Sequence, residues 1–149
     1  MRFKIFDRTK GNPVLTSNTN LAGALLATVS AGGGDQLEYD PPTNAYYNAA
    51  SRWNASGKVQ NGSGGACTAA APCTPRLIII DAATRTVTAK LPTGNNAHGL
   101  AVDPVAGKVF LPYSSSTNPA GATLDPTFLG TGTTAQGTIN GGITVYNTR

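Results

Sequence analysis

The sequence contains a segment that occurs twice. Residues 34–47, GDQLEYDPPTNAYY, correspond without a gap to residues 97–110, AHGLAVDPVAGKVF, so that Asp35 corresponds to His98. Each copy consists of two short stretches with apolar residues joined by an Asp-Pro step, which is the pattern of two strands and a turn. A third stretch recurs in residues 3–7, 77–81 and 142–146. The chain is therefore expected to be built from repeated groups of short strands.

The composition agrees with many short strands joined by turns. Charged residues make up 12% of the 149 residues, whereas glycine (18) and proline (10) are abundant. A helical bundle needs periodic runs of Ala, Leu, Glu and Lys, and a disordered chain needs a higher net charge. The net charge of +4 comes from dispersed Lys and Arg residues, so we expect no nucleic-acid partner. No apolar stretch approaches the roughly 20 residues of a membrane helix, so we expect no membrane partner.

Turn signals and apolar alternation predict about nine strands. They are expected at residues 2–7, 13–16, 36–39, 45–50, 77–80, 86–91, 99–102, 108–112 and 143–146. The fully apolar residues 77–80 predict a strand that is buried on both faces, and residues 86–91 alternate like an edge strand. Residues 17–34 are expected to be a connection, and residues 51–75 and 113–140 are polar segments of low complexity.

This strand order predicts an all-β, propeller-like fold. The chain would supply the last two strands of one blade, one complete four-stranded blade and three strands of another. Residues 1–149 are expected to form a single partial propeller of about two blades, with boundaries near 17–34 and 92–98. Closed propellers have about four to eight blades, so two blades do not close alone. We therefore expect either a homo-oligomer, in which about three chains complete a six-bladed ring, or the missing remainder of a larger propeller.

The second copy and the residues before it, LPTGNNAHGLAVDP (91–104), resemble the repeat of YVTN-type propellers. They also resemble the gluconolactonase and senescence-marker-protein family of six-bladed propellers. In that family the first strand of a blade often opens with an Asp-Gly or Asn-Gly step, which corresponds here to Asp35-Gln36 and His98-Gly99. The resemblance covers roughly residues 31–50 and 76–112. It implies a hydrolase that opens lactones or cleaves phosphoesters with a divalent metal at the mouth of a central channel.

The resemblance also implies roles for individual residues. Asp35 and His98 would face the channel, where an Asp of the family binds calcium and acts as the general base. Asp35 offers an oxygen ligand for a hard cation, whereas His98 departs from the pattern because imidazole is a poor ligand for calcium. His98 could instead serve as the base or favour zinc. We expect both residues to be catalytic and to bind the metal, with calcium as the first expectation and zinc as the alternative. Glu38 has a supporting role, although its odd spacing from Asp35 points it to the opposite face of the strand.

The expected reaction is metal-assisted attack of water on a small-molecule lactone. An N-acyl-homoserine lactone is one candidate substrate, which would make the protein a quorum-quenching enzyme. Because propellers host many chemistries, two alternatives stay open. One is a non-enzymatic propeller module that binds a ligand or a protein, and the other is a fragment of a larger propeller.

The same residues also have purely structural explanations. Asp40 and Asp103 precede prolines and are expected to cap turns. His98 could simply donate a hydrogen bond across the channel, and Asp35 could simply tie down the glycine-rich loop before it. The large aromatic residues are expected to pack in the core or between blades: Tyr46, Tyr47, Trp53 and Phe110.

Cys67 and Cys73 are the only cysteines, and they lie in a loop rich in Gly, Ala and Pro. One interpretation is a local disulfide between them, which requires an oxidising compartment, and the other is two free thiols. A zinc site would need two further ligands, and the only histidine, His98, lies far beyond Cys73 in the sequence. The first seven residues lack the pattern of a secretory signal peptide. The localisation therefore stays open, with a periplasmic or secreted parent protein as the expectation that a disulfide would favour.

Overall fold

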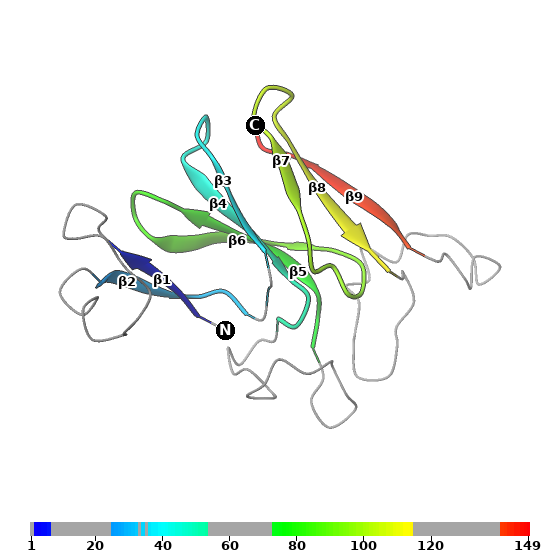
Figure 1. Ribbon diagram of the computed structural model, residues 1–149, viewed down its shortest axis with the longest axis horizontal. Coiled ribbons are helices and arrows are strands. Elements are labelled where there is room, and N and C mark those ends of the chain that lie inside the picture. The colour runs from blue at the N-terminus through cyan, green and yellow to red at the C-terminus, as the bar shows by residue number, and fades with distance from the viewer. Residues whose placement is uncertain (1, 7–24, 33, 35, 54–72, 115–140) are drawn as a thin grey trace, which may run out of the picture.

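The computed structural model describes residues 2–6, 25–32, 34, 36–53, 73–114 and 141–149 (Figure 1). These residues form nine strands and no helix, so the all-β prediction is confirmed for this part of the chain. The strands are β1 (Arg2–Phe6), β2 (Leu25–Ser30), β3 (Leu37–Asp40), β4 (Ala45–Ala50), β5 (Arg76–Asp81), β6 (Thr86–Pro92), β7 (Ala101–Asp103), β8 (Lys108–Tyr113) and β9 (Gly142–Asn147). Within the same residues, no helix is long and apolar enough to cross a membrane.

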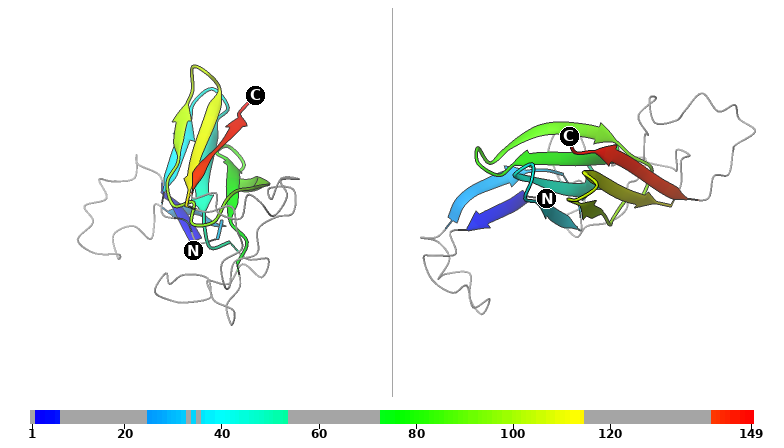
Figure 2. Two further views of the ribbon diagram at one scale, coloured as in Figure 1. Left: turned by 90° about the vertical axis from the view of Figure 1, so that its right-hand side faces the viewer. Right: turned by 90° about the horizontal axis from the view of Figure 1, so that it is seen from above.

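The strands are arranged in three antiparallel sheets. The first contains β1 and β2, the second has the order β3-β4-β5-β6, and the third has the order β7-β8-β9. Within each sheet, every strand pairs with its neighbours in sequence, and among the described strands no sheet closes into a barrel. β6 lies at the edge of its sheet, as its alternating sequence predicted. Figure 2 shows that the three sheets follow one another along the long axis of the molecule, with the four-stranded sheet in the middle.

The two copies of the repeated segment form two hairpins whose strands pair in the same register. Glu38 lies opposite Tyr47 in the hairpin of β3 and β4, and the corresponding residues of the second copy, Ala101 and Phe110, lie opposite each other in the hairpin of β7 and β8. The next two pairs toward each loop keep the same correspondence. Since a slip of one residue would exchange the two faces of a strand, corresponding residues of the two hairpins face the same way.

The first sheet corresponds to the last two strands of the four-stranded sheet. The pairing of β1 with β2 shifts by one residue between Ile5 and Phe6, and the pairing of β5 with β6 shifts in the same way between Ile79 and Ile80. A β-bulge places one extra residue on one strand at a defined position. The same irregularity at corresponding residues therefore supports the recurrence of residues 3–7 in residues 77–81.

β2 corrects the prediction that residues 17–34 form a connection. Leu25–Ser30 pair with β1, and along β2 the buried Val29 alternates with the exposed Thr28 and Ser30. This is the pattern of a half-buried strand. Two successive leucines and an Ala-rich context obscure it in the sequence. The strand predicted at residues 13–16 lies outside the described residues, and the other strand boundaries differ from the predicted ones by at most two residues.

The three described hairpin loops, which join β3 to β4, β5 to β6 and β7 to β8, have one design. Each follows an Asp at the end of a strand, has four residues, and ends in a residue with left-handed backbone geometry. These last residues are Asn44 (φ 50°), Arg85 (φ 61°) and Gly107 (φ 64°). Gly and Asn adopt this geometry readily, whereas a long side chain such as Arg adopts it at some cost.

The Asp residues cap these loops, as predicted for Asp103. Its Oδ1 accepts hydrogen bonds of 2.9 Å from the backbone N–H groups of Val105 and Ala106. Asp81 Oδ1 accepts from the backbone and the hydroxyl of Thr84, and these bonds hold the pKa of Asp81 below its usual value.

Asp40 caps its loop differently. Pro42 occupies the position of Val105 and has no N–H to donate. Asp40 Oδ2 instead accepts a bond of 2.7 Å from the Thr43 hydroxyl. The side chain is fully buried, and its Oδ1 has no partner among the described residues.

The four-stranded sheet has an apolar core on each face, because successive residues of a strand point to opposite sides. Leu77 faces β7–β9, Ile78 faces β1–β2, and both are 0% exposed, so the prediction that this strand is buried on both faces is confirmed. The core toward the third sheet contains Ala45, Tyr47, Ala49, Leu77, Leu100, Val109 and Leu111. The core toward the first sheet contains Val29, Ala31, Ala50, Ile78 and Ile80, with Tyr46 and Trp53 packed against it.

Candidate functional site

The candidate site lies where β3 and β7 begin. These two strands correspond to each other in the repeat, and they contact each other across the boundary between their sheets. The side chain of Gln36 joins them: its Oε1 accepts a hydrogen bond of 2.9 Å from the backbone N–H of Leu100, and its Nε2 donates one of 3.0 Å to Glu38 Oε1. Gly99 leaves room for this bridge, since a Cβ there would lie 3.1 Å from Gln36 Oε1.

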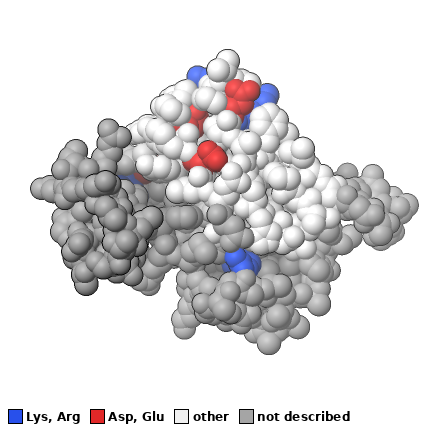
Figure 3. All heavy atoms as spheres, in the orientation of Figure 1, with Lys and Arg blue, Asp and Glu red and all other residues white. Residues whose placement is uncertain are grey.

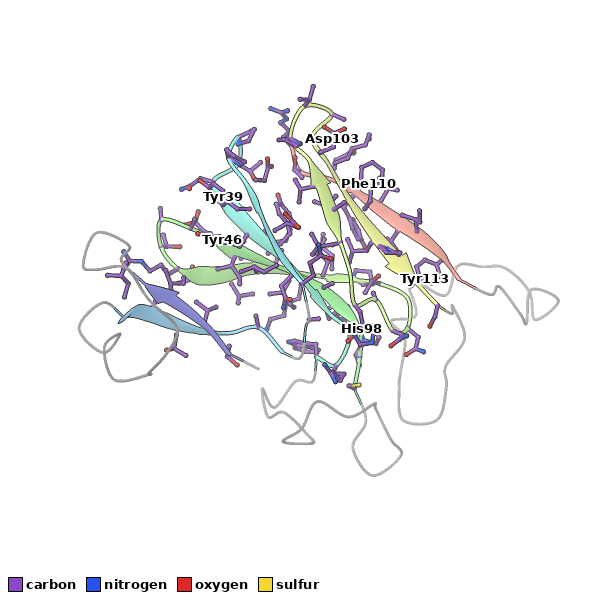
Figure 4. The ribbon with its side chains drawn as sticks, in the orientation of Figure 1. Tyr39, Tyr46, His98, Asp103, Phe110 and Tyr113 are labelled. Atoms are coloured by element: carbon purple, nitrogen blue, oxygen red, sulfur yellow. The ribbon has the colours of Figure 1, made fainter. Side chains whose placement is uncertain are left out.

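His98 immediately precedes this junction in the chain and lies at the end of β7 that is opposite to Asp103 (Figure 4). Its ring is partly exposed, and its Nε2 is hydrogen-bonded to Asn96 Oδ1. An amide oxygen only accepts hydrogen bonds, so this contact suits the ring tautomer that carries its proton on Nε2. Asn96 has left-handed backbone geometry, with φ 59°, in the connection between β6 and β7.

Glu38 lies on the side of β3 that faces the third sheet. It pairs with Tyr47, whose ring belongs to the core shared with β7–β9. Its carboxylate is oriented by Gln36. Asp35, the other residue expected at the site, lies outside the described residues, and only its neighbour Gln36 is placed against β7.

The described residues alone do not fit the expected calcium or zinc ion. Among them, no group of three or more His, Cys, Asp or Glu side chains could hold a metal ion. Apart from Glu38, the described carboxylates are those of Asp40, Asp81 and Asp103, which end strands at the hairpin loops. They are therefore at the other end of the sheets from His98, and the expected metal stays a prediction that depends on Asp35.

Gln36 and Asn96 were not candidates from the sequence. Gln36 occupies the position of Gly99 in the repeat, so the only signal was a departure from glycine in the first copy. Its role depends on a contact with Leu100, which is distant in the sequence. Asn96 is identified only by its contact with His98.

A glycine before β3 allows a close approach of two chain segments. A Cβ on Gly34 would lie 2.1 Å from Asn48 Oδ1, which no side chain could tolerate. Asn48 is fully buried, and its Nδ2 donates to the carbonyl of Ala31 at 3.3 Å. Gly34 therefore allows these two segments to pack closely, and its neighbour Gly33 lies outside the described residues.

Cys73 is buried and disulfide-bonded. Cys67 is the only other cysteine of the sequence and lies outside the described residues. On the face shown in Figure 3, charged side chains of the described residues are few, and the acidic ones lie in the upper part. The Lys and Arg side chains of the described residues do not form a continuous basic patch on this face.

No protein-family model, no curated protein and no solved structure matches this chain. The function is therefore inferred from the groups at the β3–β7 junction and from the arrangement of the sheets.

Proposed function

We propose that this chain forms consecutive blades of a β-propeller and acts as a ligand-binding module. The binding site is the end at which β3 and β7 begin. The observation that supports this best is the contact between these two strands. In a propeller the blades are arranged around a central channel, which the first strand of each blade lines. β3 and β7 are the corresponding first strands of their sheets, and they are in contact.

The groups at this end suit a small polar ligand. The carboxylate of Glu38 accepts hydrogen bonds from hydroxyl groups, and the ring of His98 offers a donor or an acceptor according to its protonation. The groups come from two neighbouring sheets, and junctions between structural units are common places for ligand sites. We expect small hydroxylated lactones and the hydroxy acids that they yield.

Lactone hydrolysis is the second candidate function, and the geometry of His98 favours it. With Nε2 hydrogen-bonded to Asn96, Nδ1 would take a proton from a water molecule as its oxygen attacks the lactone carbonyl carbon. The ring C–O bond then breaks, and the leaving oxygen receives the proton as the hydroxyl group of a hydroxy acid. A general base contributes about 10² to 10⁴-fold to such a reaction. The expected metal would polarise the carbonyl, but the described residues do not form its site, so no step is assigned to it.

One experiment tests both functions on the same compounds. Binding of glucono-1,5-lactone, gluconate and hexanoyl-homoserine lactone is measured by saturation-transfer NMR, and hydrolysis is measured in a pH-stat with chelator and with calcium or zinc added back. The variants are His98→Gln and Glu38→Gln. The control is Val105→Ala, because Val105 is 90% exposed in the loop at the other end of β7.

The outcomes separate the two functions. Binding that both site variants weaken and the control retains supports the binding module. Turnover that His98→Gln removes and the chelator leaves intact supports hydrolysis by a general base alone. Turnover that the chelator removes supports the calcium or zinc expectation and is then examined with Asp35→Ala. A folded protein that neither binds nor hydrolyses any of the compounds contradicts both functions at this site.

A further inference from the structure

The third sheet exposes apolar side chains on the face that points away from the four-stranded sheet. Ile143 is 61% exposed and Val145 is 47% exposed. Ile143 and Val145 belong to β9 and lie opposite Pro112 and Phe110 of β8. Phe110 in turn lies opposite Ala101 of β7. We call these five residues the outer apolar face: Ala101, Phe110, Pro112, Ile143 and Val145. Phe110 was expected to pack in the core or between blades, and Figure 4 shows it on this outer side of β8.

The corresponding face of the four-stranded sheet is covered. In the four-stranded sheet, Leu77 lies opposite Ala49. In the third sheet, Ile143 lies opposite Pro112. Pro112 corresponds to Ala49 when the hairpin repeat is continued along β4 and β8. Ile143 therefore corresponds to Leu77, and by the same registers Phe110 corresponds to Tyr47. This corrects by one residue the recurrence predicted from the sequence, because residues 77–81 correspond to 143–147 and not to 142–146. Yet Leu77 and Ala49 are 0% exposed and Tyr47 is 3% exposed, because β7–β9 covers them with Leu100, Val109 and Leu111.

The chain itself therefore shows what fits this face. The molecule has two boundaries between sheets, one between β1–β2 and β3–β6 and the other between β3–β6 and β7–β9. At each boundary, the face of one sheet that points toward the C-terminal sheet packs against the face of the next sheet that points toward the N-terminal sheet. Like faces never meet among the described strands. The remaining face of the complementary type belongs to β1–β2. On β2 it presents the exposed Leu26, Thr28 and Ser30, and the β1 residues opposite Thr28 and Ser30 are Lys4 and Arg2.

We infer that the outer apolar face binds a second copy of this chain, through the outer face of that copy's β1–β2 sheet. Such a head-to-tail contact repeats between copies the order of faces that is present twice within one copy, with Leu26 as the apolar contact and Lys4 at the position of Ile78. A head-to-tail interface yields a ring if its rotation closes and a filament if it does not. The inference does not depend on the ligand site, since no residue of either face belongs to that site.

The test is sedimentation velocity of the chain of residues 1–149 from micromolar to submillimolar concentration. Val145→Glu places a charge on the outer apolar face, and Leu26→Glu places one on the β1–β2 face. Val105→Glu is the matched control, because it adds the same charge at a residue that is 90% exposed in a loop. We expect the wild-type chain and the control to self-associate, and each face variant to do so at least about 30-fold more weakly, which corresponds to about 2 kcal/mol.

A mixture of the two face variants gives the decisive measurement. Val145→Glu keeps an intact β1–β2 face, and Leu26→Glu keeps an intact outer apolar face. An equimolar mixture is therefore expected to form a dimer of one copy of each and nothing larger. Circular dichroism at low concentration checks that each variant is folded, and Ile143→Lys replaces Val145→Glu if that variant is not.

Three results would overturn the inference. The first is a folded wild-type chain that stays monomeric over the whole range, which would leave another protein segment as the occupant of the face. The second is association that is lost in Val145→Glu but kept in Leu26→Glu, with no mixed dimer, because that is a contact between like faces. The third is equal weakening by Val105→Glu, because the association would then be non-specific. Lactone binding is measured on the same samples, so failure here is distinguished from failure of the proposed function.

Discussion

Leu77 and Ile143 occupy the same position in two sheets and form a matched pair for substitution. Leu77 is 0% exposed and Ile143 is 61% exposed. Replacement by Ala removes three carbons from either side chain, so the two changes differ mainly in what covers the residue. The difference in unfolding free energy between them measures how much the third sheet contributes by covering the four-stranded sheet.

The expected magnitudes follow from this exposure. Three carbons at about 0.8 kcal/mol each give a transfer term of about 2.4 kcal/mol for full burial. For Leu77→Ala the cavity adds to this, and we expect a loss of about 3 to 5 kcal/mol. For Ile143→Ala only the buried share counts, and with 61% of the side chain exposed the loss is about 1 kcal/mol. The melting temperature should fall by on the order of 10 °C for Leu77→Ala and by only a few degrees for Ile143→Ala.

Urea unfolding monitored by tryptophan fluorescence is the assay. Trp53 is the only tryptophan and packs against the core between the first and second sheets, so it reports on the folded state without lying beside either substitution. Measurements at low protein concentration keep the chain monomeric. Equal losses for the two variants would refute the reasoning, because the faces of the two sheets would then be equally covered. A loss for Ile143→Ala that grows with protein concentration would instead support the contact between copies.

Three further predictions use the same unfolding assay. Gly34→Ala should destabilise the protein by about 1 to 3 kcal/mol, because the new Cβ would lie 2.1 Å from Asn48 Oδ1; an unchanged midpoint would contradict this packing. Tyr146→Phe should remove about 0.5 to 1.5 kcal/mol, because the hydroxyl of Tyr146 donates a hydrogen bond to the carbonyl of Pro92 between two sheets; a neutral substitution would mean that water replaces the bond fully. Asp81→Ala should destabilise the protein at neutral pH and less so in acid. Because the folded-state pKa of Asp81 lies below its usual value of 3.8, its contribution is complete above that value and is lost as the pH falls through the folded-state pKa; a difference from wild type that is constant with pH would exclude the ionised carboxylate as the cause.

The strands that the sequence predicts well are those with strong local signals. Residues 77–80 are a run of β-branched and leucine side chains between turn residues, and the two Asp-Pro steps mark hairpins whose length and register recur. β2 was missed because its residues have weak strand preference and become a strand through pairing with β1. The bulges at Ile5 and Ile79 follow from pairing as well, so no local signal indicates them.

The residues of the candidate site also fall into two groups, those that a sequence signal identified and those that depend on contacts distant in the sequence. The repeat identified the step from His98 to Gly99, because corresponding residues could be compared directly. The bridge made by Gln36 depends on Leu100, which belongs to the other copy of the repeat, and no pattern of residues near Gln36 indicates it. Asp40 was expected to cap a turn and does so through Thr43, but its burial depends on the neighbouring sheet and its unusual cap depends on Pro42.

The four-residue length of the hairpin loops has a consequence for how this sequence can change over time. One inserted residue would reverse the inward and outward side chains of the following strand and expose half of both cores. Insertions and deletions are therefore expected to be excluded from these hairpins, although the residues of the three loops differ from one another. We expect them to be tolerated between β4 and β5 and between β8 and β9. Ala45 pairs with Asp81 between β4 and β5, and Lys108 pairs with Asn147 at the corresponding position between β8 and β9. The two pairs of strands therefore have the same register, although the connection between β8 and β9 is longer than the one between β4 and β5. A reporter peptide or protease site added to this protein should be placed in one of those two connections.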